Sequence, residues 1–498
     1  MSNYNDSADI AEKQLRFISK SMCYAKWSQV SLHLTNGMTN SCYHPPLHKV
    51  DINQIKQNPA ALHNTEQKKQ ERKMMLNGER PAGCSYCWRI EDVGGRSDRI
   101  YRSGENWAQN SRYDIITSLD QGNINPRYVE VNFNQSCNFK CMYCSPHLST
   151  AWEEEIKKFG PYEMEGKDAR HNDITYLDKQ GLMPLKVKQD ENPYVEAFWN
   201  WWPNLYNTLE VFRITGGEPL MDINTFKVLD YIYEHPNAWL EFSITTNMCP
   251  PKQELMNKFI EKIKKLEQIQ IWQSERFNPG SENNWYVNMA VKHFSLFVSV
   301  DSIGSHAEYI RHGLDWSLLD TNVFEFLSNT NNTAVTFINT FNALSVPRIK
   351  EYLEYILDLR SVFSKQNQGV KSIPIYDPNY THPDYIIDPR QRVWFDIPLL
   401  RSPEWQNIQI LPESFDVYLE DAIKFMKMHT NIDDYVGFYD FEIEKIERNL
   451  KILRETRYKG DDAKLHRTNF VKYFMQYDER KGTDFKKTFP EFANINNW

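Results

Sequence analysis

Three cysteines stand within one stretch of eight residues, Cys137, Cys141 and Cys144. A loop this short can bring three sulfur atoms onto one face of a small metal centre. A four-iron cluster takes four ligands, so three thiolates would leave one iron open to another molecule. One alternative is zinc, with His147 as a candidate fourth ligand. The plainest alternative is three buried cysteines that bind no metal.

Four more cysteines precede this stretch, and they can form a second set of ligands. They are Cys23, Cys42, Cys84 and Cys87. Residues 29–34 alternate in polarity and Asn36-Gly37 is a strong turn signal, so we expect a hairpin that brings the first two cysteines together. Four thiols could close a cluster completely, which favours electron transfer or structural support as its role. Structural zinc is the alternative, because a Cys-x2-Cys turn suits zinc equally well.

Strand-like and helix-like segments alternate from about residue 126 to residue 400, the pattern of a parallel α/β sheet or barrel. The predicted strands are residues 128–134, 210–214, 240–247, 294–300 and 334–342, with a sixth at either 373–376 or 393–398. Six such strands would make an open (β/α)6 barrel. Ligands bind at the carboxyl ends of the strands in such folds, so the residues that follow each strand are candidate site residues.

Several polar residues stand at these strand ends. Gly216 and Gly217 would let the backbone approach a ligand closely, and the carboxylate of Glu218 can accept hydrogen bonds from an ammonium group. Asn247 ends the third strand, although such a residue can simply cap the next helix. Arg311 follows the fourth strand, and its guanidinium group suits a carboxylate. A surface ion pair is the alternative for that arginine.

With these residues in view, the chain resembles the radical S-adenosylmethionine (SAM) superfamily, in its Cys-x3-Cys-x-aromatic-Cys stretch and in the Gly-Gly-Glu-Pro run after the second strand. The resemblance implies a 4Fe-4S cluster on Cys137, Cys141 and Cys144, which act as the catalytic cysteines. It implies that an electron from the cluster cleaves SAM to a 5′-deoxyadenosyl radical, which abstracts hydrogen from a substrate. The residues implied to contact SAM are Tyr143, Gly216, Gly217, Glu218, Asn247, Ser299, Asp301 and Arg311.

The spacing of Cys23, Gly37 and Cys42 resembles half of a SPASM or twitch domain, which holds auxiliary iron–sulfur clusters in radical SAM enzymes. In that family the module usually follows the core, whereas here it precedes the core. The later cysteines of a full SPASM domain are missing. The resemblance therefore implies a twitch-like module with one auxiliary 4Fe-4S cluster.

The length of 498 residues predicts two or three domains. We place a cysteine-rich module at residues 1–125, the (β/α)6 core at 126–400 and a helical region at 401–498. A net charge of −8 makes nucleic acid an improbable partner. The start of the chain has no signal-peptide pattern and no run of eighteen apolar residues occurs, so we expect a cytoplasmic protein without a membrane partner.

The sequence thus predicts a radical SAM enzyme. A peptide or protein is the favoured substrate, because many twitch and SPASM relatives modify peptides, and a flavodoxin or ferredoxin is the expected electron donor. A sugar or nucleotide substrate is the first alternative. The second alternative is a non-catalytic scaffold that binds an iron–sulfur cluster or zinc.

Overall fold

The computed structural model describes residues 2–117, 123–273, 285–287, 289–364, 391–430 and 436–494. One nine-stranded sheet runs through it in the order β13-β12-β10-β7-β6-β4-β1-β2-β3. Its strands are β1 (Gln29–His33), β2 (Met38–Asn40), β3 (His48–Lys49), β4 (Tyr128–Asn132), β6 (Val211–Thr215), β7 (Asn237–Thr246), β10 (Val291–Ser299), β12 (Thr333–Ile338) and β13 (Val393–Asp396). Two short ribbons pair β5 (Lys140–Cys141) with β11 (Arg311–His312), and β8 (Ile271–Gln273) with β9 (Trp285–Val287).

Six of these strands follow one another in chain order and pair in parallel, from β4 through β6, β7, β10 and β12 to β13. This mostly parallel sheet with intervening helices confirms the predicted α/β class and is compatible with an open barrel. The strand at β13 matches the prediction for residues 393–398. The competing prediction for 373–376 lies outside the described residues.

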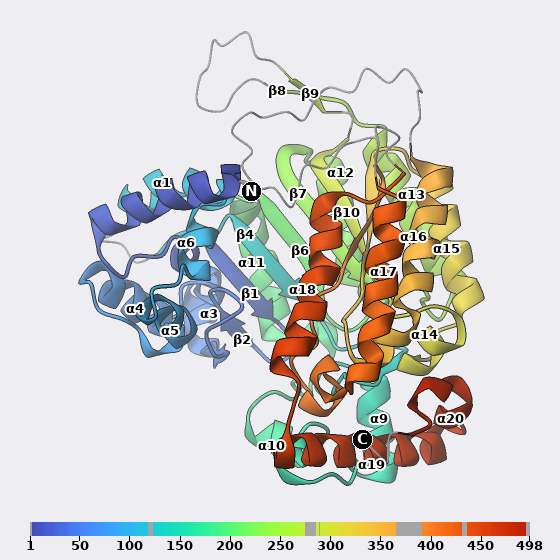
Figure 1. Cartoon of the computed structure of the whole chain (residues 1–498). Helices are drawn as coiled ribbons and strands as arrows, with labels where there is room; N and C mark the ends of the chain where they lie inside the picture. The colour runs from blue at the N-terminus through green and yellow to red at the C-terminus, as the bar shows by residue number, and fades with distance from the viewer. Residues whose placement is uncertain are drawn as a thin grey trace.

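Helices fill the connections between the strands (Figure 1). In the amino-terminal part they are α1 (Ser2–Ile18), α2 (Ala25–Ser28), α3 (Ile52–Gln57), α4 (Glu66–Leu76), α5 (Ser85–Asp92), α6 (Asp98–Ser103), α7 (Asn106–Asn110) and α8 (Arg112–Thr117). In the central part they are α9 (Thr150–Phe159), α10 (Ile174–Lys179), α11 (Pro193–Tyr206), α12 (Ile223–Glu234), α13 (Gln253–Glu267), α14 (Gly304–Ile310), α15 (Trp316–Asn329) and α16 (Ile349–Phe363). Near the carboxyl end they are α17 (Asp416–Met428), α18 (Asp440–Thr456), α19 (Gly460–Lys481) and α20 (Phe485–Thr488).

The main hydrophobic core lies between the sheet and the connecting helices. Alternate strand residues enter it, and aromatic side chains of the helices meet them there: the ring of Trp202 in α11 lies 4.9 Å from that of Phe212 in β6. The other face of the same strands carries half-buried and mostly polar residues. A parallel sheet covered on both faces is usually apolar throughout. The alternation therefore shows that only one face packs into the apolar core.

The amino-terminal region extends this sheet. Strand β1 pairs in parallel with β4 and in antiparallel fashion with β2, so the hairpin predicted around Asn36-Gly37 is present as an edge of the central sheet. Gly37 has a φ of 67°, which glycine adopts without strain. The helices α1, α4, α5 and α6 gather around this edge (Figure 1). A separate module ending at residue 125 stays a prediction, and the sheet is continuous across that boundary.

The carboxyl-terminal part of the chain is helical, as its periodicity predicts. In Figure 1, α19 and α20 lie across one end of the molecule together with α9 and α10. Helix α18 is joined to α16 by an ion pair between Glu442 and Arg360, whose side chains are both fully buried. Among the helices that the structure describes, none is both long and apolar enough to cross a membrane.

Removing one partner of this buried ion pair tests how the carboxyl-terminal helices are held. The Oε1 atom of Glu442 lies 2.6 Å from Nη2 of Arg360, and Arg360 also donates to the carbonyl group of Gly437. We expect Glu442→Ala to lower the free energy of unfolding by about 3–5 kcal/mol, because it leaves a buried cation unpaired. Chemical denaturation measures the change. The exposed Glu444 on the same helix provides the control Glu444→Ala, and equal effects of the two substitutions would contradict the prediction.

Candidate functional site

The loop with the three cysteines leaves the carboxyl end of β4 and is fixed along its backbone. Its short strand β5 pairs with β11, with Cys141 opposite Arg311. The amide of Met142 donates to the carbonyl group of Ile310 at 2.9 Å, and the indole of Trp152 donates to the carbonyl group of Cys141 at 2.9 Å. The loop is therefore held at the same edge of the sheet at which the other strands end.

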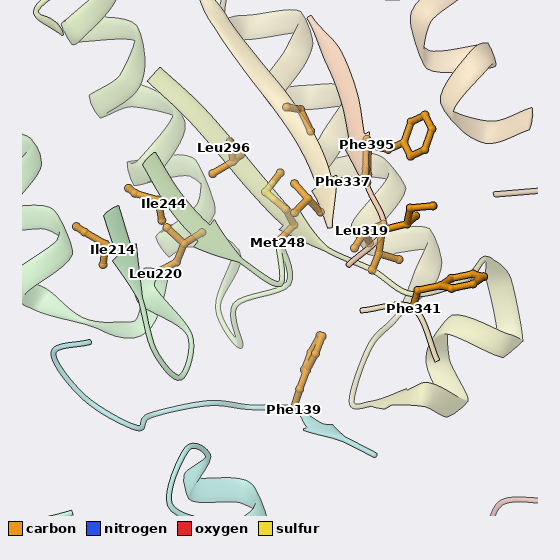
Figure 2. Close-up of a cluster of buried hydrophobic side chains, with 14 of the residues drawn as sticks. Phe139, Ile214, Leu220, Ile244, Met248, Leu296, Leu319, Phe337, Phe341 and Phe395 are labelled. Carbon is orange, nitrogen blue, oxygen red and sulfur yellow. The ribbon is translucent and has the colours of Figure 1, made fainter. Parts of the chain in front are cut away.

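Residues near the carboxyl end of the chain also hold this loop. The carbonyl group of Met142 accepts hydrogen bonds from Tyr473 of α19 at 2.9 Å and from Gln406 at 3.0 Å. Helix α19 is joined to α9 by an ion pair between Lys481 and Glu155, both fully buried. In Figure 2, Phe139 points from the loop toward Met248, and its side chain is only 1% exposed. The loop is thus clamped from the sheet side and from α19.

The three thiols lie close enough to affect one another. Burial is the main reason why the pKa of Cys137 rises to about 12, and the neighbouring Cys141 adds to that rise. Burial and the other two thiols raise the pKa of Cys144 further. Burial also raises the pKa of Cys141, and Arg311 opposes that rise, since its Nη1 donates to the sulfur at 3.3 Å. Without a bound cation these thiols are neutral at pH 7.

Within the described parts of the chain, no group of three or more His, Cys, Asp or Glu side chains is placed to hold a metal ion. A single zinc ion needs its sulfur ligands drawn in to about 2.3 Å from one centre. In a cluster each thiolate binds a different iron, so the sulfurs stand farther apart. His147, the alternative zinc ligand, is bonded through Nδ1 to Ser145 at 2.8 Å. Three thiols near one another, with the cation of Arg311 beside one of them, are a donor set that fits a cluster.

The turn after β6 lies directly against this loop. The amide of Gly217 donates to the carbonyl group of Asn134, and the amide of Glu218 donates to that of Ser136. A Cβ atom on Gly217 would stand 2.3 Å from the carbonyl oxygen of Ser136, and one on Gly216 would stand 2.5 Å from Oδ1 of Asn132. The two glycines therefore allow the close approach of the cysteine loop itself.

The carboxylate of Glu218 bridges the ends of β6 and β7. It is buried, and it accepts hydrogen bonds from the hydroxyl of Thr246 at 2.6 Å and from the amides of Asn247 and Leu220. Burial raises the pKa of Glu218, and these donors oppose the rise. The structure thus gives this residue a positioning task, and its predicted contact with SAM stays a prediction.

Asn247 joins the same network from the end of β7. Its Nδ2 donates to Oδ1 of Asn138 at 3.0 Å, and Asn138 in turn donates to the carbonyl group of Cys249. Asn138 lies between Cys137 and Cys141 in the sequence, so the end of β7 is hydrogen-bonded to the middle of the loop. Cys249 has no predicted role, but its carbonyl group accepts the hydrogen bond from Asn138.

A buried ion pair borders the loop on the side of β10. The Nε atom of Arg311 lies 2.8 Å from Oδ2 of Asp301, and the hydroxyl of Tyr143 donates to the same oxygen at 2.9 Å. Asp301 also accepts from the amide of Thr340 at 2.7 Å. This is a buried pair, so a surface ion pair is the wrong alternative for Arg311. Ser299, the last residue of β10, is half-buried at the same edge.

The four amino-terminal cysteines also lie near one another. Burial, with a further rise from Cys23, raises the pKa of Cys42 and of Cys87 to about 12. The ammonium group of Lys26 opposes the rise that burial causes in the pKa of Cys84, and it lies 2.5 Å from Glu71. The four cysteines lie near the amino-terminal ends of β1 and β4, since the hydroxyl of Tyr43, the residue after Cys42, lies within hydrogen-bonding distance of the Tyr128 hydroxyl, at 2.6 Å. The two cysteine sets therefore lie toward opposite ends of these strands.

The sequence identified the cysteines and the residues at the strand ends, but it missed several residues that hold them. Those residues are Asn138, Trp152, Gln406 and Tyr473. Trp152 and Asn138 are near the cysteines in the sequence, but nothing in their pattern shows a hydrogen bond to the loop. Gln406 and Tyr473 lie more than 260 positions away, and no local signal could have linked them to it.

Comparison with known proteins gives one partial similarity. No family model and no solved structure matches the chain. A curated relative, the GTP 3′,8-cyclase of Campylobacter lari, is 26% identical over 127 residues, which is 26% of this chain and 29% of the relative. The chain thus matches less than a third of that relative. Because the relative is a radical SAM enzyme, the similarity supports the radical SAM superfamily, with its 4Fe-4S cluster and SAM, and leaves the twitch or SPASM subtype open.

The contact between turn and loop can be tested at Gly217. We expect Gly217→Ala to destabilise the protein by about 1–3 kcal/mol, because the new Cβ overlaps backbone that is hydrogen-bonded on both sides. Thermal unfolding measures this loss, and limited proteolysis reports whether residues 133–148 become accessible. Gly94 has a positive φ and open space around it, so Gly94→Ala is the control for backbone strain alone. If Gly94→Ala made the loop as accessible to proteolysis as Gly217→Ala does, the predicted role of the contact between turn and loop would be wrong.

Proposed function

We propose that this chain is a radical SAM enzyme with an open (β/α)6 barrel, in which Cys137, Cys141 and Cys144 hold a 4Fe-4S cluster. The single observation that carries the proposal is the position of the three thiols, which are clamped at the carboxyl edge of a parallel sheet against the Gly216-Gly217 turn. When bound, the cluster supplies an electron that cleaves SAM, and the resulting 5′-deoxyadenosyl radical abstracts hydrogen from the substrate.

The residues around the loop position the site and keep water out of it. Arg311 places a positive charge beside the sulfur of Cys141, and Asp301 and Tyr143 fix the orientation of its guanidinium group. The side chains of Tyr473 and Tyr477 are fully buried between α19 and the loop. Their hydroxyls donate to backbone carbonyl groups of Met142 and Tyr309, respectively. In this proposal, SAM binds to the residues at the strand ends that the resemblance implies.

The buried charges of the amino-terminal region support a second metal centre there. Lys26, Lys68 and Arg72 are all buried near one another, and Lys26 is paired with Glu71. Burial and the two neighbouring cations lower the pKa of Lys68 well below its usual range. Four thiolates on a zinc ion or a cluster carry about two negative charges, which would favour the charged form of the buried Lys26 and Lys68. We assign an auxiliary 4Fe-4S cluster to Cys23, Cys42, Cys84 and Cys87.

Two classes of substrate are proposed for this chemistry. A peptide or protein is the first candidate, with a flavodoxin or ferredoxin as the electron donor. A nucleotide is the second candidate, and the name of the relative, GTP 3′,8-cyclase, favours keeping it. The alternative to an enzyme is a metal-binding scaffold without catalysis. An assay of SAM cleavage distinguishes this scaffold from an enzyme that acts on a peptide or a nucleotide.

The proposed open iron is tested by substituting one of its cysteines. After anaerobic reconstitution with iron and sulfide, the unmodified chain should release 5′-deoxyadenosine from SAM under dithionite. Cys141→Ala should abolish this release, because the cluster loses one of its three ligands. Cys249→Ala is the matched control, since that cysteine belongs to neither set, and it should retain cleavage. Cleavage that survives in Cys141→Ala would show that the open iron is assigned to the wrong residues.

The second metal centre is tested by metal analysis of Cys87→Ala. We expect the iron content of the reconstituted chain to fall to about half that of the unmodified protein, because one of two 4Fe-4S clusters loses a ligand. Some uncoupled SAM cleavage should remain, since the other cluster is untouched. Iron and zinc are measured together by mass spectrometry. Bound zinc that disappears in Cys87→Ala while iron stays constant would assign the site to zinc instead.

A further inference from the structure

The half-buried face of the parallel sheet carries a row of polar side chains that the proposed chemistry does not use. Glu130 of β4 pairs with Arg213 of β6, which pairs with Ser243 of β7, which pairs with Ser295 of β10. Paired residues in neighbouring strands point to the same face, so these four side chains share it. Burying polar groups against apolar ones is unfavourable. A row of this kind therefore indicates a face that meets water or a polar ligand.

Arg213 is the cation of this row. Its Nη1 donates to the hydroxyl of Tyr128 at 3.1 Å, and its guanidinium carbon lies 4.9 Å from the centre of the Phe297 ring. Its Nε is buried and, among the residues that the structure describes, has no hydrogen-bond partner. Within the same residues, no carboxylate lies at ion-pair distance from it. The orientation of the guanidinium group is thus fixed, while part of its donor fork is unused.

The surroundings of Arg213 keep it charged. Tyr128, Tyr43 and Glu130 act on it electrostatically and hold its pKa above the usual range despite burial. The nearby Glu130 instead accepts a hydrogen bond from Tyr43 at 3.2 Å. A fixed, charged and incompletely paired guanidinium group stacked on an aromatic ring has the geometry that binds carboxylate and phosphate groups.

The position of Arg213 relates it to the proposed radical site. It precedes Gly216 by three residues in an extended chain, which corresponds to about 10 Å. A molecule that reaches from the cysteine edge of the sheet to Arg213 is therefore about as long as a nucleotide or a short peptide. Ser243 and Ser295 lie level with Arg213 on the two neighbouring strands, and Ser295 is bonded to His293 at 2.7 Å.

We propose that Arg213 binds an oxyanion of the substrate, a carboxylate or a phosphate, on this polar face of the sheet. The inference rests on the proposed function for calling that molecule a substrate, whereas the anion site itself rests on the structure alone. A purely structural role, in which Arg213 only joins Tyr128 to Phe297, is the competing explanation.

Anion titration of the reconstituted full chain, without SAM, tests this site. Inorganic phosphate and glutarate are titrated separately by calorimetry at constant ionic strength, and the tighter of the two identifies the kind of oxyanion. We expect one saturable site, with binding weakened by about tenfold or more in Arg213→Gln, because two charge-assisted hydrogen bonds are lost. Arg213→Lys should weaken binding less, since it keeps the charge and loses the fork.

The controls separate this proposal from its alternatives. Arg96 is paired with Asp9 and Glu12 in the amino-terminal region, so Arg96→Gln should bind both anions as the unmodified chain does. Should Arg213→Gln fail to fold, Arg213→Lys compared with Arg96→Gln still decides the question. Absence of saturable binding to the unmodified chain, or equal binding by all variants, overturns the anion site. SAM cleavage by the unmodified chain is assayed separately, and its absence would end the proposed function without affecting the anion result.

Discussion

The close packing of two backbone segments, the cysteine loop and the Gly216-Gly217 turn, is the constraint on which the site depends. No side chain beyond hydrogen fits at Gly217, where a Cβ atom would meet the backbone of Gln135 and Ser136. Once the two segments touch, the amides of the turn satisfy carbonyl groups of the loop, and the loop cannot shift without breaking them. The carboxylate of Glu218 extends the same arrangement to the end of β7. Three strand ends are thereby locked around the three thiols.

Electrostatics differs between the two cysteine sets. Beside the three-cysteine loop, the charge of Arg311 is balanced by Asp301. Beside the four-cysteine group, Lys26, Lys68 and Arg72 outnumber Glu71. Buried charges are unfavourable in a folded chain unless they are paired or hydrogen-bonded. The four-thiolate centre proposed above would offset part of this charge.

The sequence predicted much of the fold, because its signals were local. The strands alternate or run apolar, glycines and prolines mark their ends, and the cysteine spacing is short. The predicted strand 334–342 is shorter in the structure, where β12 ends at Ile338 and a 3-10 helix begins at Ala343. The pairing of β1 with β4 was not predicted, since a hairpin reads the same whether it stands alone or joins a sheet. The hydrogen bonds from Gln406 and Tyr473 to Met142 could not be predicted either, because only the folded chain brings these residues together.

The hydrogen bond from Tyr473 of α19 to the three-cysteine loop also affects when that loop can fold during synthesis of the chain. Tyr473 reaches back across 331 positions to the carbonyl group of Met142, so the segment with the three cysteines lacks this hydrogen bond until Tyr473 itself has left the ribosome. Contacts this distant in sequence form late, because a long loop must close first. The three-cysteine loop therefore reaches its final, fully hydrogen-bonded form only after the segment around Tyr473 has packed against it.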